Sequence, residues 1–327
     1  MMDMMFYEVF QEEEKVLKRY LPKEIQAGFT AKTIQAEDSK TPPSPLISIR
    51  TQSLIPSAWI EKLSGILTRS VGFDHLMDLQ KRGSGKLAFG YLPSYCERSV
   101  AEHAILVALS LARGLKKQIR HFETFDRDHL TGSECFGRNV LVVGVGRIGS
   151  EMVRLAQGLG MQVKGVDLVK KVKTLTYVPL EEGIRFAEMI LCALPLTKLT
   201  KGMLNEASLK HAKPGTFFVN ISRGEISPVA DLKRLLDEGI LGGIGLDIYE
   251  DEKQLAEYLR TKKGALTESG KTILSLKDRD NVILTPHNAF NTEEALERKA
   301  KQSIESTATF LKEKSFPYPV PFEEGEG

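Results

Sequence analysis

Three polar residues follow apolar, strand-like runs in the second half of the chain, and together they are suited to redox chemistry on a hydroxy acid. Arg223 follows "FFVNIS", Glu252 follows "GLDIYED" and His287 follows "NVILTP". A histidine can take the proton of a hydroxyl group near neutral pH while hydride leaves the carbon. A carboxylate beside the ring would orient it and favour its protonated form. An arginine would hold a substrate carboxylate in a bidentate grip.

Each of these residues alone would be explained as well by a surface position after a strand. The trio gains weight from an upstream stretch, "VVGVGRIGSE", in which Gly144, Gly146 and Gly149 form G-x-G-x-x-G. This stretch follows the apolar run "NVLVV" and opens a helical pattern. Asp167 ends the next strand-like run, close to the ~20-residue spacing expected of a ribose-binding acid. The spacing therefore predicts a dinucleotide site rather than a turn with incidental glycines.

The glycine positions have distinct physical roles in such a loop. Gly144 permits the tight turn, Gly146 lets the backbone approach a pyrophosphate, and Gly149 allows the helix to pack closely on the strand. Arg147 and Ile148 lie in the first turn of the helix, whose free N–H groups and positive dipole end face the phosphates. Asp167 would accept hydrogen bonds from the ribose and repel a 2′-phosphate, which favours NAD over NADP.

The elements that position these residues are a series of apolar runs separated by helix-like stretches. Six runs predict strands: "NVLVVG", "MQVKGVD", "EMILCALP", "GTFFVNIS", "GGIGLDIY" and "NVILTP". Nearly continuous apolar character is typical of parallel strands with helices on both faces. The pattern predicts a Rossmann-type, doubly wound parallel sheet.

Strand-like and helix-like segments also alternate over the first ~95 residues, which indicates a second, smaller parallel α/β domain. A long helix follows from Glu97. Its apolar face is predicted to comprise Val100, Ala104, Val107, Ala108, Leu111 and Leu115. His103 lies on this helix and is expected to have a packing or interdomain role. A last amphipathic helix precedes the Pro-rich, acidic tail "FPYPVPFEEGEG", which is expected to be mobile.

Composition narrows the class of protein. The 327 residues are 42% hydrophobic and 27% charged, with a net charge of +2 and no basic block, so no nucleic-acid role is expected. No apolar run is long enough to cross a bilayer, so no membrane role is expected. Three separated cysteines favour reduced thiols in a cytoplasmic protein. The histidine spacing predicts no metal site.

With these motifs the chain resembles the D-isomer-specific 2-hydroxyacid dehydrogenase family. The resemblance is specific in "VGVGRIGSEMVRLAQGLGMQVKGVD", "KPGTFFVNISRGEI", "GIGLDIYEDE" and "NVILTPHNAFNT", and weaker in "TRSVGFDH" and "YLPSYCERSVAEH". It implies that Arg223 of S-R-G, Glu252 of D-x-Y-E-x-E and His287 of T-P-H are catalytic. It also implies NAD as cofactor and a small 2-keto or 2-hydroxy acid as substrate.

The resemblance implies further residues and an architecture. Val71 and Gly72 would hold the substrate carboxylate through backbone N–H groups, with help from Tyr95. Asp247 would lie beside the nicotinamide, and Pro195 would line the cofactor cleft. Residues 1–96 and 290–327 would form a discontinuous, flavodoxin-like substrate domain, and residues 97–289 the NAD-binding domain. Both domains would contribute to the active site, and two chains would form a homodimer through the NAD-binding domain.

Two departures bear on the substrate. Lys253 stands where the glycerate and glyoxylate branches have proline, and this change together with the long insert after it resembles the D-lactate dehydrogenase branch. That branch has an arginine just after its first strand, where this chain has Gln11. We therefore expect side chains bulkier than the methyl group of pyruvate to be accepted. The alternatives are a dehydrogenase of another small anion such as phosphite, with Arg69 near the carboxylate loop, or an NAD(H)-sensing protein like the C-terminal-binding-protein corepressors.

Overall fold

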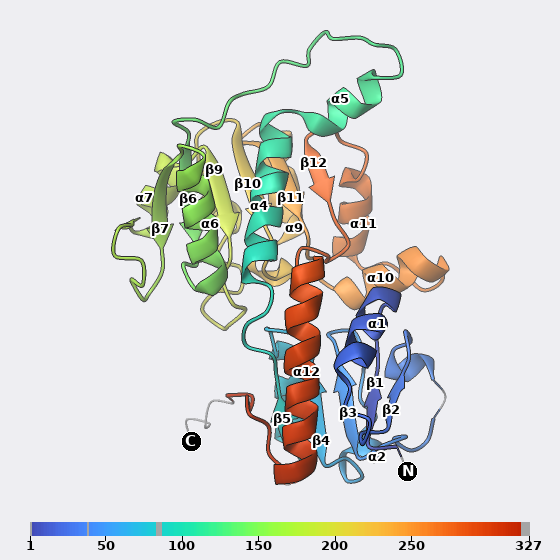
Figure 1. The fold of residues 1–327 in the computed structure, drawn as a ribbon. Coiled ribbons are helices and arrows are strands. Elements are labelled where there is room, and N and C mark those ends of the chain that lie inside the picture. The colour runs from blue at the N-terminus through green and yellow to red at the C-terminus, as the bar shows by residue number, and fades with distance from the viewer. Residues whose placement is uncertain (1, 38, 83–86, 322–327) are drawn as a thin grey trace. The chain divides into compact units, whose positions relative to one another are not determined.

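The computed structural model describes residues 2–37, 39–82 and 87–321, which form two compact units (Figure 1). Unit 1 combines Met1–Cys96 with Asn291–Gly327, and unit 2 is Glu97–Phe290. Lys86 is the first residue of the strand-like run "KLAFGYLP". This residue and the final residues 322–327 lie outside the described ranges.

Unit 1 contains a parallel sheet of five described strands in the order β2-β1-β3-β4-β5. The strands are β1 (Met4–Phe6), β2 (Ala27–Phe29), β3 (Leu46–Ile49), β4 (Gly65–Thr68) and β5 (Ala88–Gly90). The helices are α1 (Gln11–Tyr20), α2 (Ser57–Ile60), α3 (Met77–Arg82) and α12 (Glu293–Glu313), with 3-10 turns at Ile34–Ala36 and Asp74–Leu76. This strand order is that of flavodoxin, so the predicted fold of the smaller domain is confirmed.

The two faces of the unit 1 sheet are covered differently. One face packs around Trp59, Ile47 and Ile66 in a core that α2 and the 3-10 turns close. The other face carries α1 and α12, which lie side by side (Figure 1). Gly65 of β4 is required here, because a Cβ would lie 2.5 Å from the ring of Phe310 on α12.

The beginning of the tail is ordered, contrary to expectation. The Tyr91 N–H donates to the Tyr318 carbonyl, and the Val320 N–H donates to the Phe89 carbonyl. The ring of Phe316 stacks on Phe310 at 4.5 Å between centroids. The apolar residues that alternate with the prolines therefore extend the edge of the sheet, and the prediction of a mobile tail is wrong for residues 316–321.

Unit 2 contains a parallel sheet of seven described strands in the order β12-β11-β10-β9-β6-β7-β8. The six predicted runs contain β6 (Asn139–Val143), β7 (Gln162–Val166), β9 (Met189–Cys192), β10 (Thr216–Asn220), β11 (Leu241–Leu246) and β12 (Val282–Leu284). The two-residue edge strand β8 (Thr176–Tyr177) was not predicted. Across the sheet the strands lie in the order β8, β7, β6, β9, β10 and β11, which is the doubly wound order 3-2-1-4-5-6, so the Rossmann-type fold is confirmed.

Helices cover both faces of this sheet (Figure 1). On one face lie α4 (Glu97–Ala112) and α6 (Arg147–Gly158). The core of the other face is built with α7 (Leu180–Phe186), α8 (Glu206–Leu209), α9 (Val229–Asp237) and α11 (Glu268–Leu276). The remaining described helices are α5 (Leu115–His121), α10 (Glu252–Thr261) and the 3-10 turn Gly224–Ile226.

The long helix that was predicted from Glu97 is two helices. Gly114 has φ +58°, a left-handed conformation that ends α4 and redirects the chain into α5. Leu115 is consequently 42% exposed, and its predicted place on the buried face is wrong. Within the described ranges, none of the helices is both long and apolar enough to span a bilayer.

Candidate active site

The structure brings His287 and Glu252 of unit 2 into direct contact. The Nδ1 atom of His287 lies 2.7 Å and 2.9 Å from the two carboxylate oxygens of Glu252. The imidazole is 27% exposed and the carboxylate 20%, so both are held yet reachable. A carboxylate can only accept, so Nδ1 carries the hydrogen of this bond. The Nε2 atom is therefore the nitrogen that can exchange a proton with a bound molecule.

Asp247 fixes the segment that presents His287. Its Oδ1 atom accepts from the Thr285 hydroxyl at 2.6 Å and from the Asn288 N–H at 2.9 Å, and Oδ2 accepts from the Ala289 N–H at 2.9 Å. His287 itself has φ +52°, which a histidine tolerates better than most residues. Asp247 is only 2% exposed. The geometry gives its carboxylate the role of holding residues 285–289.

Two residues that the sequence did not assign to the site join this network. The Nε2 atom of His103 on α4 lies 3.1 Å from the Thr285 hydroxyl and 3.8 Å from Asp247 Oδ1. The Tyr249 hydroxyl donates to the Thr285 carbonyl at 2.7 Å. Burial and the nearby carboxylates of Asp247 and Glu252 raise the pKa of Tyr249, so its hydroxyl remains a donor. The sequence signal for Tyr249 was its place inside the D-x-Y-E-x-E motif.

Arg223 lies on a loop that packs directly on the loop carrying Glu252. Gly224, the last residue of S-R-G, has the Glu250 nitrogen 2.1 Å from where a Cβ would be, so any other residue would push the loops apart. The Asn220 side chain supports the turn by donating to the Arg223 carbonyl at 3.0 Å. The Arg223 side chain is half-buried, and its Nη1 donates to the Ser222 carbonyl at 2.8 Å. This hydrogen bond orients the guanidinium group of Arg223 at the carboxyl end of β10.

The glycine loop has the geometry of a phosphate cradle. Gly144 has φ +89°, and a Cβ there would lie 2.8 Å from the Ala193 backbone. A Cβ on Gly149 would lie 1.9 Å from the Gly144 carbonyl oxygen. Gly146 differs, because a Cβ there would meet nothing within 4 Å. Nothing described in the protein demands glycine at that position, so the open space before α6 fits the approach of a pyrophosphate.

The other predicted cofactor residues lie around this loop. Asp167 Oδ2 accepts from the Val145 N–H at 2.6 Å and Oδ1 from the Val169 N–H at 2.8 Å, which locks the acid against the glycine loop. Each oxygen keeps a lone pair for a ribose hydroxyl. Arg147 and Ile148 begin α6, with Arg147 exposed and Ile148 half-buried. Pro195 is exposed after β9, and its carbonyl accepts from the Thr200 hydroxyl.

In unit 1, Val71 and Gly72 follow β4 in a bend. No residue within the described ranges accepts a hydrogen bond from either backbone N–H, so both donors are available. The Ser70 hydroxyl donates to the Gly72 carbonyl at 2.7 Å and shapes the bend. Tyr95 is 4% exposed, and its hydroxyl donates to the Arg69 carbonyl at 3.5 Å. Through that contact Tyr95 supports the loop that carries Val71 and Gly72.

Two residues were singled out for the substrate question. Gln11 is the first residue of α1 and is exposed. Arg69 is fully buried, with Nε on Glu13, Nη1 on the Ser48 hydroxyl and Nη2 on the Tyr7 carbonyl. Its guanidinium is committed inside unit 1, which removes the cation on which the phosphite alternative depended.

Known proteins resemble this chain in sequence and in fold. Residues 105–289 match the family model described as D-isomer specific 2-hydroxyacid dehydrogenase, NAD binding domain. A D-lactate dehydrogenase of Treponema pallidum is 31% identical over 263 residues, which is 77% of this chain and 76% of the relative. A D-specific alpha-keto acid dehydrogenase of Enterococcus faecium is 28% identical, over 75% of each chain. The crystal structure of a D-lactate dehydrogenase from Aquifex aeolicus with NAD and lactic acid has a TM-score of 0.85, 29% identity, and coverage of 97% of this chain and 99% of the other.

Proposed function

The chain belongs to the D-isomer-specific 2-hydroxyacid dehydrogenase family, and on that premise we propose which of its residues carry out the reaction. It is an NAD-dependent oxidoreductase that interconverts a small 2-keto acid and the D-2-hydroxy acid, in the manner of D-lactate dehydrogenases. When bound, NADH supplies a hydride to C2 of the keto acid. The protein must then orient the carbonyl, hold the carboxylate and deliver one proton to the carbonyl oxygen.

We propose that His287 delivers the proton from Nε2. The observation that carries this assignment is the contact of Nδ1 with both oxygens of Glu252, because it leaves only Nε2 for the substrate. The carboxylate stabilises the imidazolium before the transfer, and the neutral ring remains oriented by the same hydrogen bond afterwards. In the opposite direction His287 accepts the hydroxyl proton while hydride leaves C2. Asp247, Thr285 and His103 hold the segment that aims the ring.

Arg223 is proposed to hold the substrate carboxylate and to draw electron density from the carbonyl. A guanidinium binds a carboxylate through two parallel N–H donors, which fixes orientation as well as charge. The Val71 and Gly72 N–H groups are proposed to bind the same carboxylate, because neither donates to any residue in the described part of the chain. Tyr95 supports that loop through the Arg69 carbonyl.

The cofactor residues are proposed to be Gly144, Gly146, Arg147, Ile148, Gly149, Asp167, Pro195 and Asp247. The open space at Gly146 supports the phosphate site. Asp167 supports a preference for NADH, because a 2′-phosphate would meet a carboxylate already fixed by two backbone N–H groups.

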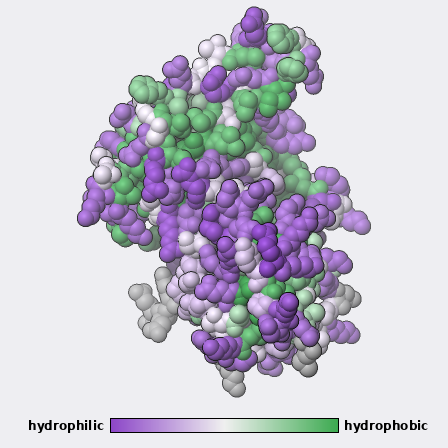
Figure 2. Space-filling model, viewed as in Figure 1, coloured by the Kyte–Doolittle hydropathy of each residue, from purple (hydrophilic) through white to green (hydrophobic). Residues whose placement is uncertain are grey.

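We propose that two chains associate through unit 2. The side chains of Leu106, Leu115, Ile119, Phe122 and Phe125 are exposed on α4, on α5 and just after α5. Figure 2 shows apolar side chains gathered over the region where Figure 1 draws these helices. A contiguous apolar patch of this kind marks an interaction site. Ile119→Asp should convert a dimer to a monomer in sedimentation experiments, and an unchanged mass would exclude this surface.

We propose a cytoplasmic location because of the state of the three cysteines. Cys96, Cys135 and Cys192 form no disulfides with one another, which suits a reducing compartment.

The assay that tests the proposed reaction follows the loss of NADH absorbance after a panel of 2-keto acids is added. Turnover with at least one of them, and the D configuration of the product, are expected. Binding of NADH without turnover on any keto acid would instead favour the sensing role.

A further inference from the structure

The carboxyl end of the unit 1 sheet has a topological switch point between β1 and β3. In a sheet of order β2-β1-β3-β4-β5 the chain winds in opposite directions from these two central strands. Ligands of doubly wound folds bind in the crevice that this reversal creates. Glu8 follows β1 there and Arg50 follows β3. The Arg69 N–H donates to the Ile49 carbonyl at 2.8 Å, so the Val71–Gly72 bend begins beside Arg50.

Glu8 holds the loop that carries Arg50 in one conformation. Its carboxylate accepts from the backbone N–H groups of Arg50 at 2.9 Å, Gln52 at 2.9 Å and Ser53 at 3.2 Å. Glu8 itself is buried with φ +56°, a left-handed conformation that is strained for a non-glycine residue. Such strain persists where the surroundings over-determine it, and it concentrates at functional sites. Here it serves to preorganise the loop of Arg50.

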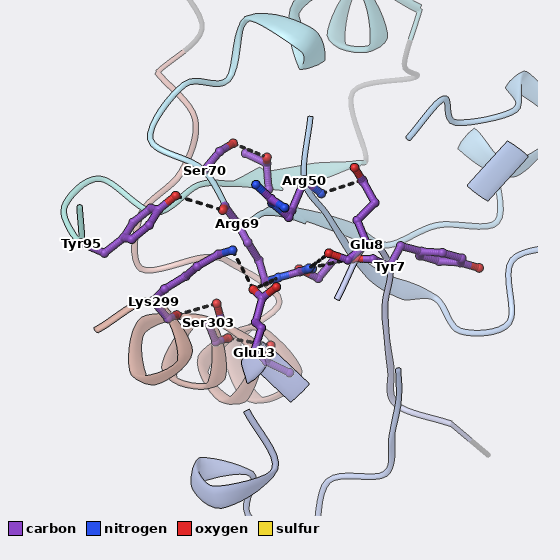
Figure 3. Close-up of polar contacts among 12 residues, drawn as sticks. Tyr7, Glu8, Glu13, Arg50, Arg69, Ser70, Tyr95, Lys299 and Ser303 are labelled. Atoms are coloured by element: carbon purple, nitrogen blue, oxygen red, sulfur yellow. Dashed lines mark hydrogen bonds and ion pairs between the residues drawn. The ribbon is translucent and has the colours of Figure 1, made fainter. Parts of the chain in front are cut away.

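Behind Arg50 lies a buried charge cluster made of Glu13, Arg69 and Lys299 (Figure 3). Glu13 Oε1 contacts Arg69 Nε at 3.0 Å and Lys299 Nζ at 2.7 Å, and all three residues are fully buried. Burial raises the pKa of Glu13, but Arg69, Lys299 and Arg50 outweigh it and hold that pKa well below its usual range.

The balance of charge around Lys299 is positive. Burial lowers its pKa to about 7, and the repulsion of Arg50 and Arg69 acts in the same direction against the attraction of Glu13. Glu13 contacts Arg69 and Lys299, and the charge of Arg50 also acts on both Glu13 and Lys299, while the carboxylate of Glu8 is engaged by backbone N–H groups. An additional anion beside the cluster would relieve this repulsion.

Arg50 is the cation of this group that a ligand can reach. Arg69 and Lys299 are fully buried, whereas Arg50 is half-buried. Its guanidinium carbon lies 4.4 Å from the centre of the Phe10 ring, which is 36% exposed and forms an apolar wall. A guanidinium beside an apolar ring suits a carboxylate at the end of a short methylene chain.

We propose that Arg50 binds a second carboxylate, on the side chain of the keto acid, so that the preferred substrates are 2-keto dicarboxylic acids. This inference rests on the proposed function, because the Val71 and Gly72 N–H groups then take the C1 carboxylate while Arg50 takes the distal one. The redox step is unchanged: one hydride and one proton reduce the 2-keto group, and the distal carboxylate is not altered.

The test compares keto acids that differ only in the distal carboxylate. The pairs are 2-ketoglutarate with 2-ketopentanoate, and oxaloacetate with 2-ketobutyrate. The kcat/KM of the unmodified enzyme should be at least on the order of 10-fold higher for the diacid of each pair, as expected of a charge-assisted hydrogen bond. This comparison needs no variant, so it does not depend on whether a substitution folds.

Arg50→Gln should lower kcat/KM for 2-ketoglutarate on the order of 10- to 100-fold and for 2-ketopentanoate by less than about 3-fold. Most of the loss should be in KM. Arg50→Lys keeps a cation and should retain a reduced preference for the diacid. Arg19→Gln is the matched control, because Arg19 is 58% exposed on α1 in an ion pair with Glu297, and it should change neither value.

The outcomes separate this inference from the function on which it rests. If no keto acid of either series is reduced, both fall. If monoacids are reduced as well as their diacid partners, the assignment of Arg50 is wrong and the dehydrogenase assignment stands. An equal loss on both members of a pair in Arg50→Gln would mean that Arg50 serves the C1 carboxylate, and it too would overturn the inference.

Discussion

The charged clusters of the two units differ in how far they are exposed to solvent. In unit 2, His287 and Glu252 face one another at 2.7 Å and remain 27% and 20% exposed. In unit 1, Glu13, Arg69 and Lys299 are in comparable contact but completely buried. A pair that must exchange a proton with a substrate has to stay partly open to it. A buried cluster cannot reach a substrate, and it acts on geometry and electrostatic field instead.

Contact distance alone therefore does not identify a catalytic group. Both clusters contain a carboxylate within 3 Å of a basic side chain. Loss of the open pair should reduce turnover and leave stability intact, and loss of the buried group should reduce stability. The following experiments test that division.

His287→Gln should lose on the order of 10²–10⁴-fold in kcat, the usual worth of a positioned acid–base group. Because the ring is partly exposed, the free energy of unfolding should change by less than about 1 kcal/mol. Steady-state kinetics and urea denaturation of the same preparation measure both. Turnover within a few-fold of the unmodified enzyme would remove the proposed proton transfer.

Glu13→Gln should lower the free energy of unfolding by about 3–5 kcal/mol, because it leaves the buried Arg69 and Lys299 without their carboxylate. Glu12→Gln, one residue earlier and exposed on the same helix, should stay within about 0.5 kcal/mol. Urea denaturation of the two variants in parallel gives the comparison. Equal stability of both would show that the buried cluster is not a structural requirement of unit 1.

Arg223→Lys keeps the charge but loses the planar fork, so kcat/KM for the keto acid should fall roughly 10- to 100-fold. The affinity for NADH should be nearly unchanged, which fluorescence titration of the nucleotide can measure. If both values fall together, Arg223 supports the loop at the end of β10 and does not hold the substrate.

Lys299→Met should remove a pH dependence of stability. The pKa of Lys299 is lowered from 10.5 to about 7 in the folded chain. Between those values the unfolded chain binds a proton that the folded chain has released, so stability rises with pH across this window. The stability difference between the unmodified protein and the variant should therefore grow in favour of the unmodified protein from about pH 7 to about pH 9. A constant difference would show that Lys299 keeps its usual basicity.

Substitutions at residue 11 should have the smallest effect. Gln11 is exposed at the start of α1, so Gln11→Arg should leave the ranking of pyruvate, 2-ketobutyrate and phenylpyruvate unchanged, within about 3-fold. A ranking reversed by Gln11→Arg would mean that the start of α1 reaches the substrate, and that unit 1 acts on it through a side chain outside the buried cluster.

Local sequence was sufficient for the parts of the site that a few neighbouring residues define. The G-x-G-x-x-G spacing between an apolar run and a helical pattern predicts a strand, a left-handed turn at Gly144 and a helix beginning at Arg147, and the structure has all three. The six long apolar runs likewise form strands. Such elements follow from periodicity and backbone sterics, which act over a few residues. Strand β8 was not predicted, because two residues are too few to show a hydrophobic periodicity.

Which charged residues meet is set by the packing of segments that are far apart in the sequence. Glu252 and His287 are 35 positions apart in the chain; the sequence suggested a carboxylate beside the ring, and the fold supplies the 2.7 Å contact. Glu13 stands in a run of glutamates and Lys299 in a polar stretch of α12, yet both are buried against one another. Their helical positions, four before Leu17 and three after Leu296, were a signal that each lies on an apolar face. The identity of the partner was not encoded there, because a buried charge is stabilised by whatever opposite charge the packing of distant segments brings within reach.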